Sequence, residues 1–529
     1  MLKRKFLAKA LAAFLSVGIL TAVPNFYDAK ICEAEVLIPM QTFNLNFDAK
    51  RGVEKTLTCE GRAIKFIAYE NIVYVQNPAD VESQMLSVYI PAEYLRGGMI
   101  NGYTAKTAPI FMPNGVGGYM PGKIQAPSEK SFGQDIPNAS LVALSRGLVV
   151  VSPAIRGRTT VAASGRYVGK APAFIVDYKA AVRYLRFNRD RLPAGDTEKI
   201  ISNGTSAGGA LSAALGSMGN APEFKPYLED IGAADERDDI FASSDYCPIT
   251  NLENADKAYE WIFHGVNKYY QAMWQIQDRQ ARGLDKSAKK SDVKVDADSA
   301  NNPTASKQAV KMTGAEIKIS KKLRDAFPDY VNNLNLRDES GKKLTLDKNG
   351  DGSFKDYIKK KYAESAQGEL DAGVDISDAN WVIIKNKRVV DIDLKKYAVT
   401  ATRMKAAPAF DKMDLSSAEN DEFGTPENKP RHFSEIVQKN SGGVMAPEEE
   451  IKMMNPLNFI GRQDVNVAPH FRIRHGAIDR DTSLAIPAIL ALRLQNNGID
   501  VDFFSPWGKG HAGDYDLDEL FDWIDKICK

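Results

Sequence analysis

Residues 199–209 read Lys199-Ile200-Ile201-Ser202-Asn203-Gly204-Thr205-Ser206-Ala207-Gly208-Gly209. The apolar start of this run predicts a short strand, and the small and apolar residues that follow it predict a helix. Between the two lies Gly204-x-Ser206-x-Gly208, whose glycines let strand and helix backbones pass closely at a sharp turn. The turn exposes the Ser206 hydroxyl at a helix N-terminus, where free N–H groups suit a developing oxyanion. Without a strand and a helix around it, this pattern would indicate only a flexible Gly/Ser turn.

Strands and helices are predicted to alternate on both sides of this turn. Residues 35–100 alternate apolar and polar positions, which predicts antiparallel strands, among them 65–70, 72–75 and 85–91. Further strands are predicted at 109–112, 147–152, 239–244 and 501–504, and the sheet pattern also resumes in the run 471–481. Helices are predicted at 139–146, 177–186, 484–497 and 517–527. The alternation predicts an α/β fold, with a mostly parallel sheet and helices on both faces.

The alternation breaks between residues 247 and 454, which predicts a large inserted lid. Within it, residues 278–311 are rich in Lys, Asp, Ala and Ser, which indicates an exposed helix-loop or a partly disordered stretch. We therefore expect a first part of the core at 35–246, the lid at 247–454 and the second part of the core at 455–529.

Composition limits the classes of function. The chain has 529 residues, 44% hydrophobic and 26% charged, with a net charge of +1. These values are typical of a globular protein and give no general attraction to nucleic acid or an acidic membrane. The four cysteines Cys32, Cys59, Cys247 and Cys528 form no C-x-x-C pair, which argues against a zinc or redox site.

The first 34 residues have the pattern of a secretory signal peptide. A basic start, with Lys3, Arg4 and Lys5, precedes an apolar run at 11–23 that is too short for a comfortable membrane span. We expect cleavage after Ala34 and a protein that is secreted or held at the cell surface or in the periplasm. An uncleaved anchoring helix is the alternative.

The order Ser206…Asp479…His511 predicts a serine nucleophile, its acid and its base. A serine needs a base within hydrogen-bond reach and a carboxylate that orients the base. His511 ends a loop directly after a predicted strand, whereas His475 more simply shapes the turn before Asp479. His470 opens a strand, and His264 and His432 lie in the insertion. This order matches the α/β-hydrolases, which the elbow pattern also resembles.

The oxyanion hole is expected from two places. One N–H comes from Ala207, directly after the serine, and the other from Gly117 or Gly118 in the glycine-rich loop that follows the strand at 109–112. A plain turn is the alternative for that loop. Asp481 lies two residues after the acid, and on base rates it would be a solvated loop charge.

The motifs together resemble the bacterial tannases, tannin acyl hydrolases with a large lid. The resemblance covers the chain after residue 34 and is weakest at 280–400. It rests on four runs: Arg472-Ile473-Arg474-His475-Gly476-Ala477-Ile478-Asp479-Arg480-Asp481-Thr482-Ser483, Pro506-Trp507 with His511-x-Gly513-Asp514-Tyr515-Asp516, Met112 to Gly122, and Asp245 to Asn251, beside the serine elbow.

This resemblance implies hydrolysis of galloyl esters to gallic acid and an alcohol or sugar, with no metal or organic cofactor. It also implies that Lys405, Glu419 and Asp481 bind the phenolic hydroxyls of the galloyl ring, with Lys412 as the rival to Lys405. Thr205 and Ala512 stand where fungal tannases and feruloyl esterases have a disulfide beside the nucleophile and the base. A feruloyl or general carboxylesterase and a catalytically silent binding protein remain alternatives, and the natural ester and oligomeric state stay open.

One further motif lies in the insertion. Residues 347–352 fit the first half of a calcium loop, so that Asp347, Asn349 and Asp351 are candidate ligands of a structural calcium ion. Position twelve is Ile358 instead of Glu, and the alternative is a polar turn.

Overall fold

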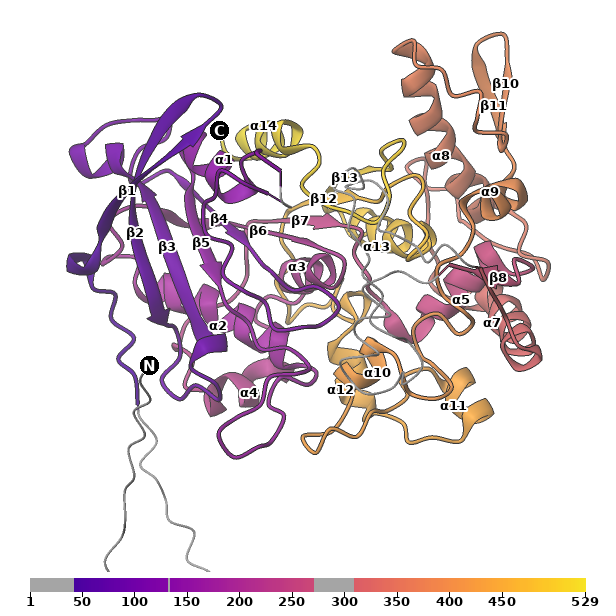
Figure 1. Ribbon diagram of the computed structural model, residues 1–529, viewed down its shortest axis with the longest axis horizontal. Coiled ribbons are helices and arrows are strands. Elements are labelled where there is room, and N and C mark those ends of the chain that lie inside the picture. The colour runs from indigo at the N-terminus through magenta and orange to yellow at the C-terminus, as the bar shows by residue number, and fades with distance from the viewer. Residues whose placement is uncertain (1–41, 132–133, 271–308) are drawn as a thin grey trace, which may run out of the picture. The chain divides into compact units, whose positions relative to one another are not determined.

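A long mixed sheet runs through the part of the chain that the structure describes. The structure is a computed structural model, and it describes residues 42–131, 134–270 and 309–529. Across these residues the largest sheet has nine strands in the order β1-β2-β3-β5-β4-β6-β7-β12-β13 (Figure 1). The predicted signal peptide and most of the 278–311 segment lie outside the described residues. No helix in the described ranges is long and apolar enough to cross a membrane.

The sheet has an antiparallel part and a parallel part. The antiparallel strands are β1 (Val53–Cys59), β2 (Arg62–Val73) and β3 (Met85–Pro91), and β3 also pairs antiparallel with the next strand in the sheet. The parallel strands, in spatial order, are β5 (Val149–Pro153), β4 (Pro109–Pro113), β6 (Asp196–Thr205), β7 (Ala242–Tyr246), β12 (His470–Arg474) and β13 (Asp500–Phe504). The predicted α/β fold with a mostly parallel sheet is therefore confirmed.

Burial explains which strands read as continuous apolar runs. All five residues of β4, of β5 and of β7 are buried, whereas most of β1 is exposed. Strands covered on both faces have no solvent side and need no alternation, which is why β4 and β5 read as short apolar blocks, whereas β7 is buried although it contains two serines and an aspartate. The expected strand at 239–244 begins three residues later, at Ala242.

Helices cover both faces of the parallel part. They are α1 (Ala139–Ser145), α2 (Ala173–Phe187), α3 (Ala207–Ser217), α4 (Lys225–Asp230), α13 (Ala485–Gln495) and α14 (Leu517–Cys528). In Figure 1, α1 and α14 lie on one side of the sheet, and α2 and α3 lie on the other. Phe521 of α14 packs edge-on against Phe111 of β4, with ring centroids 5.3 Å apart. The amphipathic C-terminal helix predicted from the sequence thus closes the core.

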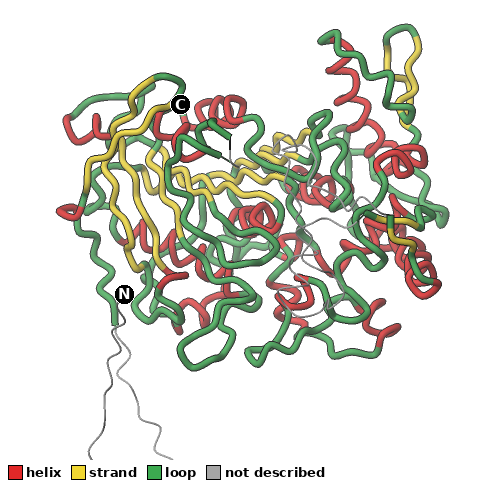
Figure 2. Tube along the Cα trace, viewed as in Figure 1, coloured by secondary structure: helices red, strands yellow, loops and turns green. Residues whose placement is uncertain are grey.

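The insertion lies between two neighbouring strands, because β7 pairs directly with β12 while residues 247–469 run between them. Its elements are α5 (Leu252–Phe263), β8 (Lys268–Tyr269), β9 (Val310–Lys311), α7 (Gly314–Asn333), α8 (Ser353–Asp371), β10 (Val382–Lys385), β11 (Arg388–Ile392), α9 (Leu394–Ala401), α10 (Ala418–Glu422), α11 (Glu435–Ser441) and α12 (Glu448–Met453). Short 3₁₀ helices lie at Ala49–Arg51, Glu82–Gln84, Ala92–Arg96, Pro222–Phe224 and Pro456–Asn458. Figure 2 shows that helices and loops make up most of the insertion.

Aromatic rings pack against one another within the insertion, and apolar packing joins it to the core. The rings of Trp261 and Phe327 lie 5.1 Å apart, and Phe354 packs against both. These residues belong to the same continuous apolar cluster as the strands of the core, and Thr42–Lys529 form one compact unit. The insertion is therefore held against the carboxyl ends of the parallel strands by burial of apolar surface.

Candidate active site

Ser206 stands at the turn between β6 and α3. Its backbone has φ 62° and ψ −121°, and its N–H donates to the carbonyl of Tyr246 at 2.9 Å. A side chain with positive φ outside glycine is strained, so the surrounding bonds must hold it there. The predicted sharp strand-to-helix turn is present, and it presents the serine at the N-terminus of α3.

The two glycines of the motif are required by close backbone contacts. A Cβ on Gly204 would lie 2.3 Å from the carbonyl oxygen of Gly208, and one on Gly208 would lie 2.6 Å from the carbonyl oxygen of Val116. Asn114 fixes the same region, because its amide nitrogen donates to the carbonyls of Asn203 at 3.1 Å and Gly208 at 3.0 Å. Asn114 was not among the predicted site residues, although its place directly after a buried strand was a signal.

The structure brings the predicted nucleophile, base and acid together. The Nε2 atom of His511 lies 2.8 Å from Ser206 Oγ, and its Nδ1 lies 2.8 Å from Asp479 Oδ2. The other carboxylate oxygen of Asp479 accepts the N–H of Asp481 at 2.8 Å. The three residues follow β6, β12 and β13, and the C-terminal ends of these parallel strands meet at one edge of the sheet.

The surroundings shift the pKa values of the acid and the base in opposite directions. Burial raises the pKa of the Asp479 carboxyl, but the His511 and His475 imidazoles outweigh burial and hold that pKa below its usual range. Burial lowers the pKa of His511, but the carboxylates of Asp479 and Asp481 outweigh it and raise that pKa well above its usual value. His511 is therefore a strong proton acceptor, as a general base for a serine must be.

Of the other four histidines, His475 lies against the acid and three make contacts elsewhere. His475 is fully buried with its Nε2 3.5 Å from Asp479 Oδ2, behind the acid as expected from the turn. His470 pairs with Asp500, and His264 contacts the Ser320 hydroxyl. His432 contacts Asp411 inside the insertion.

The candidate oxyanion groups lie on either side of the elbow. Ala207 is the first residue of α3, so its N–H has no carbonyl partner within the helix. Gly117 and Gly118 follow the strand β4 and the Asn114 anchor, and in the described part of the chain their N–H groups donate to no backbone acceptor. These three N–H groups remain candidates for the oxyanion hole.

Asp481 is buried, contrary to the base-rate expectation of a solvated charge. It is 1% exposed, and within the described residues neither carboxylate oxygen has a hydrogen-bond partner. The ammonium of Lys405 lies 3.4 Å from Asp481 Oδ1 and donates to the Asp481 carbonyl at 3.0 Å. Lys405 also lies over the Phe410 ring, 4.2 Å from its centroid.

The other two candidate binding residues in the insertion are Glu419 and Lys412. Burial raises the pKa of the Glu419 carboxyl, and nearby Lys405 partly offsets that shift. Lys412 instead donates to the Ala406 carbonyl at 2.8 Å, and burial lowers the pKa of its ammonium to about 8. Of the two rival lysines, Lys405 is the one that contacts Asp481.

A buried ion pair connects the glycine-rich turn to the helix that carries Glu419. Arg158 donates from Nε to the Gly118 carbonyl at 2.9 Å and from Nη1 to Asp421 Oδ2 at 2.7 Å. Lys170 binds the other oxygen of Asp421 at 2.7 Å. No local sequence pattern indicated this link, because its partners are far apart in the chain.

The calcium candidate forms a turn whose side chains already have partners. Asp347 Oδ1 accepts the N–H groups of Asn349 at 2.8 Å and Asp351 at 3.0 Å. The carboxylate of Asp351 pairs with Lys355 at 2.5 Å. This arrangement matches the polar turn that was the alternative, and calcium binding there stays untested.

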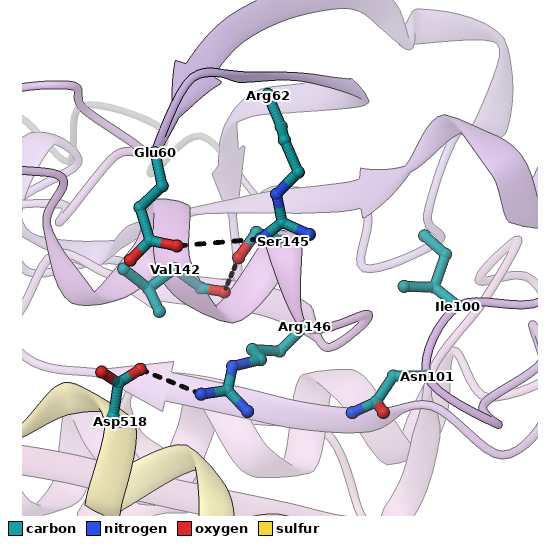
Figure 3. A pocket seen from close by; sticks show the side chains of 8 residues that line it. All are labelled: Glu60, Arg62, Ile100, Asn101, Val142, Ser145, Arg146 and Asp518. Carbon is teal, nitrogen blue, oxygen red and sulfur yellow. Dashed lines mark hydrogen bonds and ion pairs between the residues drawn. The ribbon is translucent and has the colours of Figure 1, made fainter.

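Three cavities lined by described residues lie away from the catalytic candidates. The cavity in Figure 3, about 380 Å³, lies by the β1–β2 turn, with Arg62 and Arg146 among its lining residues and Arg146 paired with Asp518. Two others, of about 190 and 400 Å³, are lined by residues near the N-terminal strands and by the 349–351 turn with α5, α7 and α9.

Comparison with known proteins gives close relatives. A family model described as BD-FAE matches residues 130–298. Tannin acyl hydrolase from Lactobacillus plantarum is 44% identical, with a TM-score of 0.82 over 92% of this chain and 99% of that one. Fusobacterium nucleatum tannase is 47% identical, with a TM-score of 0.84 over 92% of this chain and 100% of that one. A tannin acyl hydrolase in complex with ethyl gallate is 44% identical, with a TM-score of 0.81 over 92% and 99%.

A search of curated protein sequences gave no match. The identity to the solved structures nevertheless extends over nearly the whole length of each of them and over the core and the insertion of this chain. The chain therefore belongs to the bacterial tannase family of α/β-hydrolases and is a carboxylic ester hydrolase.

Proposed function

We propose that this protein hydrolyses galloyl esters through a Ser206–His511–Asp479 triad. The observation that carries the chemistry is the chain of two 2.8 Å contacts, from Ser206 Oγ to His511 and from His511 to Asp479. The observation that carries the substrate class is the buried carboxylate of Asp481, whose oxygens have no hydrogen-bond partner in the described part of the chain. The solved relative that holds ethyl gallate supports the same class.

The reaction proceeds in two acyl-transfer steps. His511 takes the Ser206 proton through Nε2 as the oxygen attacks the ester carbonyl, and the oxyanion lies against the N–H groups of Ala207 and of Gly117 or Gly118. His511 then gives that proton to the leaving alcohol. A water molecule, activated by His511, attacks the galloyl-serine and releases gallic acid. Asp479 stays ionised and stabilises the imidazolium.

Ring recognition follows from unmet hydrogen-bonding capacity. A buried carboxylate without hydrogen bonds costs about 1–3 kcal/mol or more. The Lys405 ammonium, 3.4 Å from Asp481 Oδ1, offsets only part of that cost, and a ligand that supplies hydroxyl donors relieves the rest. The three adjacent hydroxyls of a galloyl ring donate to Asp481 and Glu419 and accept from Lys405. A ring that lacks these hydroxyls leaves the same groups unpaired and binds poorly, which discriminates against benzoates and methoxylated ferulates.

The reaction needs no metal or organic cofactor in this proposal, since nucleophile, base, acid and oxyanion donors all come from the chain. The basic and apolar start at residues 1–34 further leads us to infer export from the cytoplasm, as a secreted, cell-surface or periplasmic enzyme.

Gallic acid release from methyl gallate, beside methyl ferulate and methyl benzoate, tests the proposal with purified protein. A strong preference for the gallate is the expected result. Equal turnover of all three esters would support the triad and contradict the proposed role of Lys405, Glu419 and Asp481 in ring recognition. No turnover of any ester would favour a binding protein with a hydrolase fold.

A further inference from the structure

One buried thiol lies beside the triad and has no part in the reaction described above. Cys247 directly follows β7, the strand between β6 and β12 in the sheet. Its N–H donates to the Arg474 carbonyl at 2.7 Å, and its Sγ donates to the Ala512 carbonyl at 3.4 Å. Its backbone φ is 44°, a strained value that these neighbours hold in place. The thiol is thus fixed next to the residue after His511.

Cys247, Asp479 and His511 bring three different ligand atoms together. One sulfur, one carboxylate oxygen and one ring nitrogen lie within 4.8 Å of one another, a grouping found once in the described ranges. Each residue follows a different strand, and the three strands β7, β12 and β13 are consecutive neighbours in the sheet. A small inward movement of side chains would bring all three donors to a common centre.

The donor set selects a chemical class of ligand. Thiolate, imidazole and carboxylate are the groups that bind Zn²⁺ at about 2.0–2.3 Å in tetrahedral sites, often with water as a fourth ligand. The sulfur favours Zn²⁺ or Cd²⁺ over Mg²⁺ and Ca²⁺, which require oxygen ligands in larger number. His511 keeps 13% of its side chain exposed, which leaves an approach to the cluster from the substrate side.

We propose that Cys247, Asp479 and His511 form an inhibitory site for a zinc-class divalent cation. On binding, the Cys247 thiol loses its proton to solvent. When the metal coordinates His511 through Nδ1, it also replaces the hydrogen bond between His511 and Asp479, and the Nδ1 proton moves to Nε2. Coordination through Nδ1 leaves the proton on Nε2, and coordination through Nε2 occupies the lone pair that faces Ser206. Either mode removes the base, and the inhibition rests on the proposed triad.

Binding is tested first, without reference to activity. Cobalt(II) added to the purified protein is expected to give a thiolate-to-metal charge-transfer band in the near ultraviolet, which Zn²⁺ then abolishes by displacement. Cys247→Ser is expected to lose the band and to weaken zinc binding more than about tenfold in equilibrium dialysis. Cys528→Ser is the matched control, because that buried thiol lies on α14 outside the cluster, and it should keep both signals.

Inhibition is tested with 4-nitrophenyl acetate, because the adjacent hydroxyls of a galloyl ring would themselves chelate the metal. Zn²⁺ is expected to inhibit the wild-type protein and EDTA to restore the rate, while Mg²⁺ has no effect. Cys247→Ser, compared with its own metal-free rate, should resist Zn²⁺ by more than about tenfold.

Defined results would overturn the proposal. They are a cobalt band that persists in Cys247→Ser, or zinc binding of equal strength in wild type and variant. Should Cys247→Ser fail to fold, His511→Gln carries the binding test, and retention of the cobalt band and zinc affinity there would be equally contrary. A protein that binds zinc through the cluster but hydrolyses no ester would retain the site and refute the proposed function, so the two failures are distinguishable.

Discussion

The core and the insertion each contain a serine, a histidine and an aspartate connected in the same order. In the insertion, His432 Nε2 lies 2.7 Å from Ser441 Oγ, and His432 Nδ1 lies 2.6 Å from Asp411 Oδ1. By distances alone this array equals that of Ser206, His511 and Asp479. The surroundings of the two serines differ, and that difference separates a catalytic arrangement from a structural one.

The two serines lie at opposite ends of helices. Ser206 precedes the N-terminus of α3, where the helix dipole and free N–H groups favour negative charge. Ser441 is the last residue of α11, and its hydroxyl donates to the Val437 carbonyl at 3.1 Å. The negative end of a helix disfavours an oxyanion, so the second array has a nucleophile-like contact without a place for the charge that attack would create. Hydrogen-bond connectivity is therefore not sufficient evidence for a triad.

Replacing each serine should give the largest contrast. Ser206→Ala is expected to lower kcat/KM for methyl gallate by more than about a thousandfold, because the nucleophile is removed. Ser441→Ala should leave kcat/KM unchanged. Both rates are measured on variants whose circular dichroism matches the wild type. Substantial turnover by Ser206→Ala that disappears in the double variant would assign catalysis to the insertion.

Replacing the aspartate of each array should lower the catalytic rate in the core and the stability of the fold in the insertion. Asp479→Asn is expected to lower kcat about ten-thousandfold, since the amide favours the wrong tautomer of His511. Asp411 also accepts the N–H groups of Phe433 and Ser434. Asp411→Asn should therefore reduce the free energy of unfolding by about 1–3 kcal/mol and leave kcat unchanged. Denaturant titration beside steady-state kinetics checks both, and a large loss of kcat in Asp411→Asn would contradict the structural role.

The residues of the core array could be predicted from sequence because the constraints on them are local. A strand, a turn and a helix mark Ser206, and of the five histidines His511 ends the loop after the last predicted strand. The sequence of the insertion has no comparable strand-turn-helix pattern to mark its binding residues. The choice between Lys405 and Lys412 rested on spacing in a resembling family, and the burial of Asp481 ran against its base rate. The contacts of Asn114 and Arg158 join distant segments, so only the folded chain reveals them.

The buried carboxylate of Asp481 lies beside the core array and affects its base. The oxygens of Asp481 lack hydrogen-bond partners within the described residues, and this negative charge acts on His511. Because His511 has to be neutral to accept a proton, its raised pKa places the acidic limb of kcat/KM above the usual imidazole range, with activity increasing as pH rises.

Removing the Asp481 charge should shift that limb. Asp481→Asn is expected to lower the pKa of His511 and move the limb to lower pH. The profile is measured with 4-nitrophenyl acetate, which has no galloyl ring to bind. Glu419→Gln is the matched control, because Glu419 is a buried carboxylate of the same trio and is not among the groups that shift the pKa of His511. An unmoved limb in Asp481→Asn would show that another group sets it.

The turn at 347–351 gives the smallest expected effect. Its sequence suggests a calcium loop in the insertion, just as Ser441 suggests a nucleophile there, and in both cases the side chains already have partners. A cation at this turn would have to displace Lys355 from Asp351 and would still lack the bidentate carboxylate of a complete loop. Dialysis against EDTA is therefore expected to leave the melting temperature and the rate on methyl gallate unchanged. Lys355→Ala supplies the sharper comparison, because it frees the Asp351 carboxylate. A calcium-dependent rise in melting temperature in that variant alone would mean that the lysine occupies the place of the ion. The same rise in the wild type would mean that the turn is a calcium site.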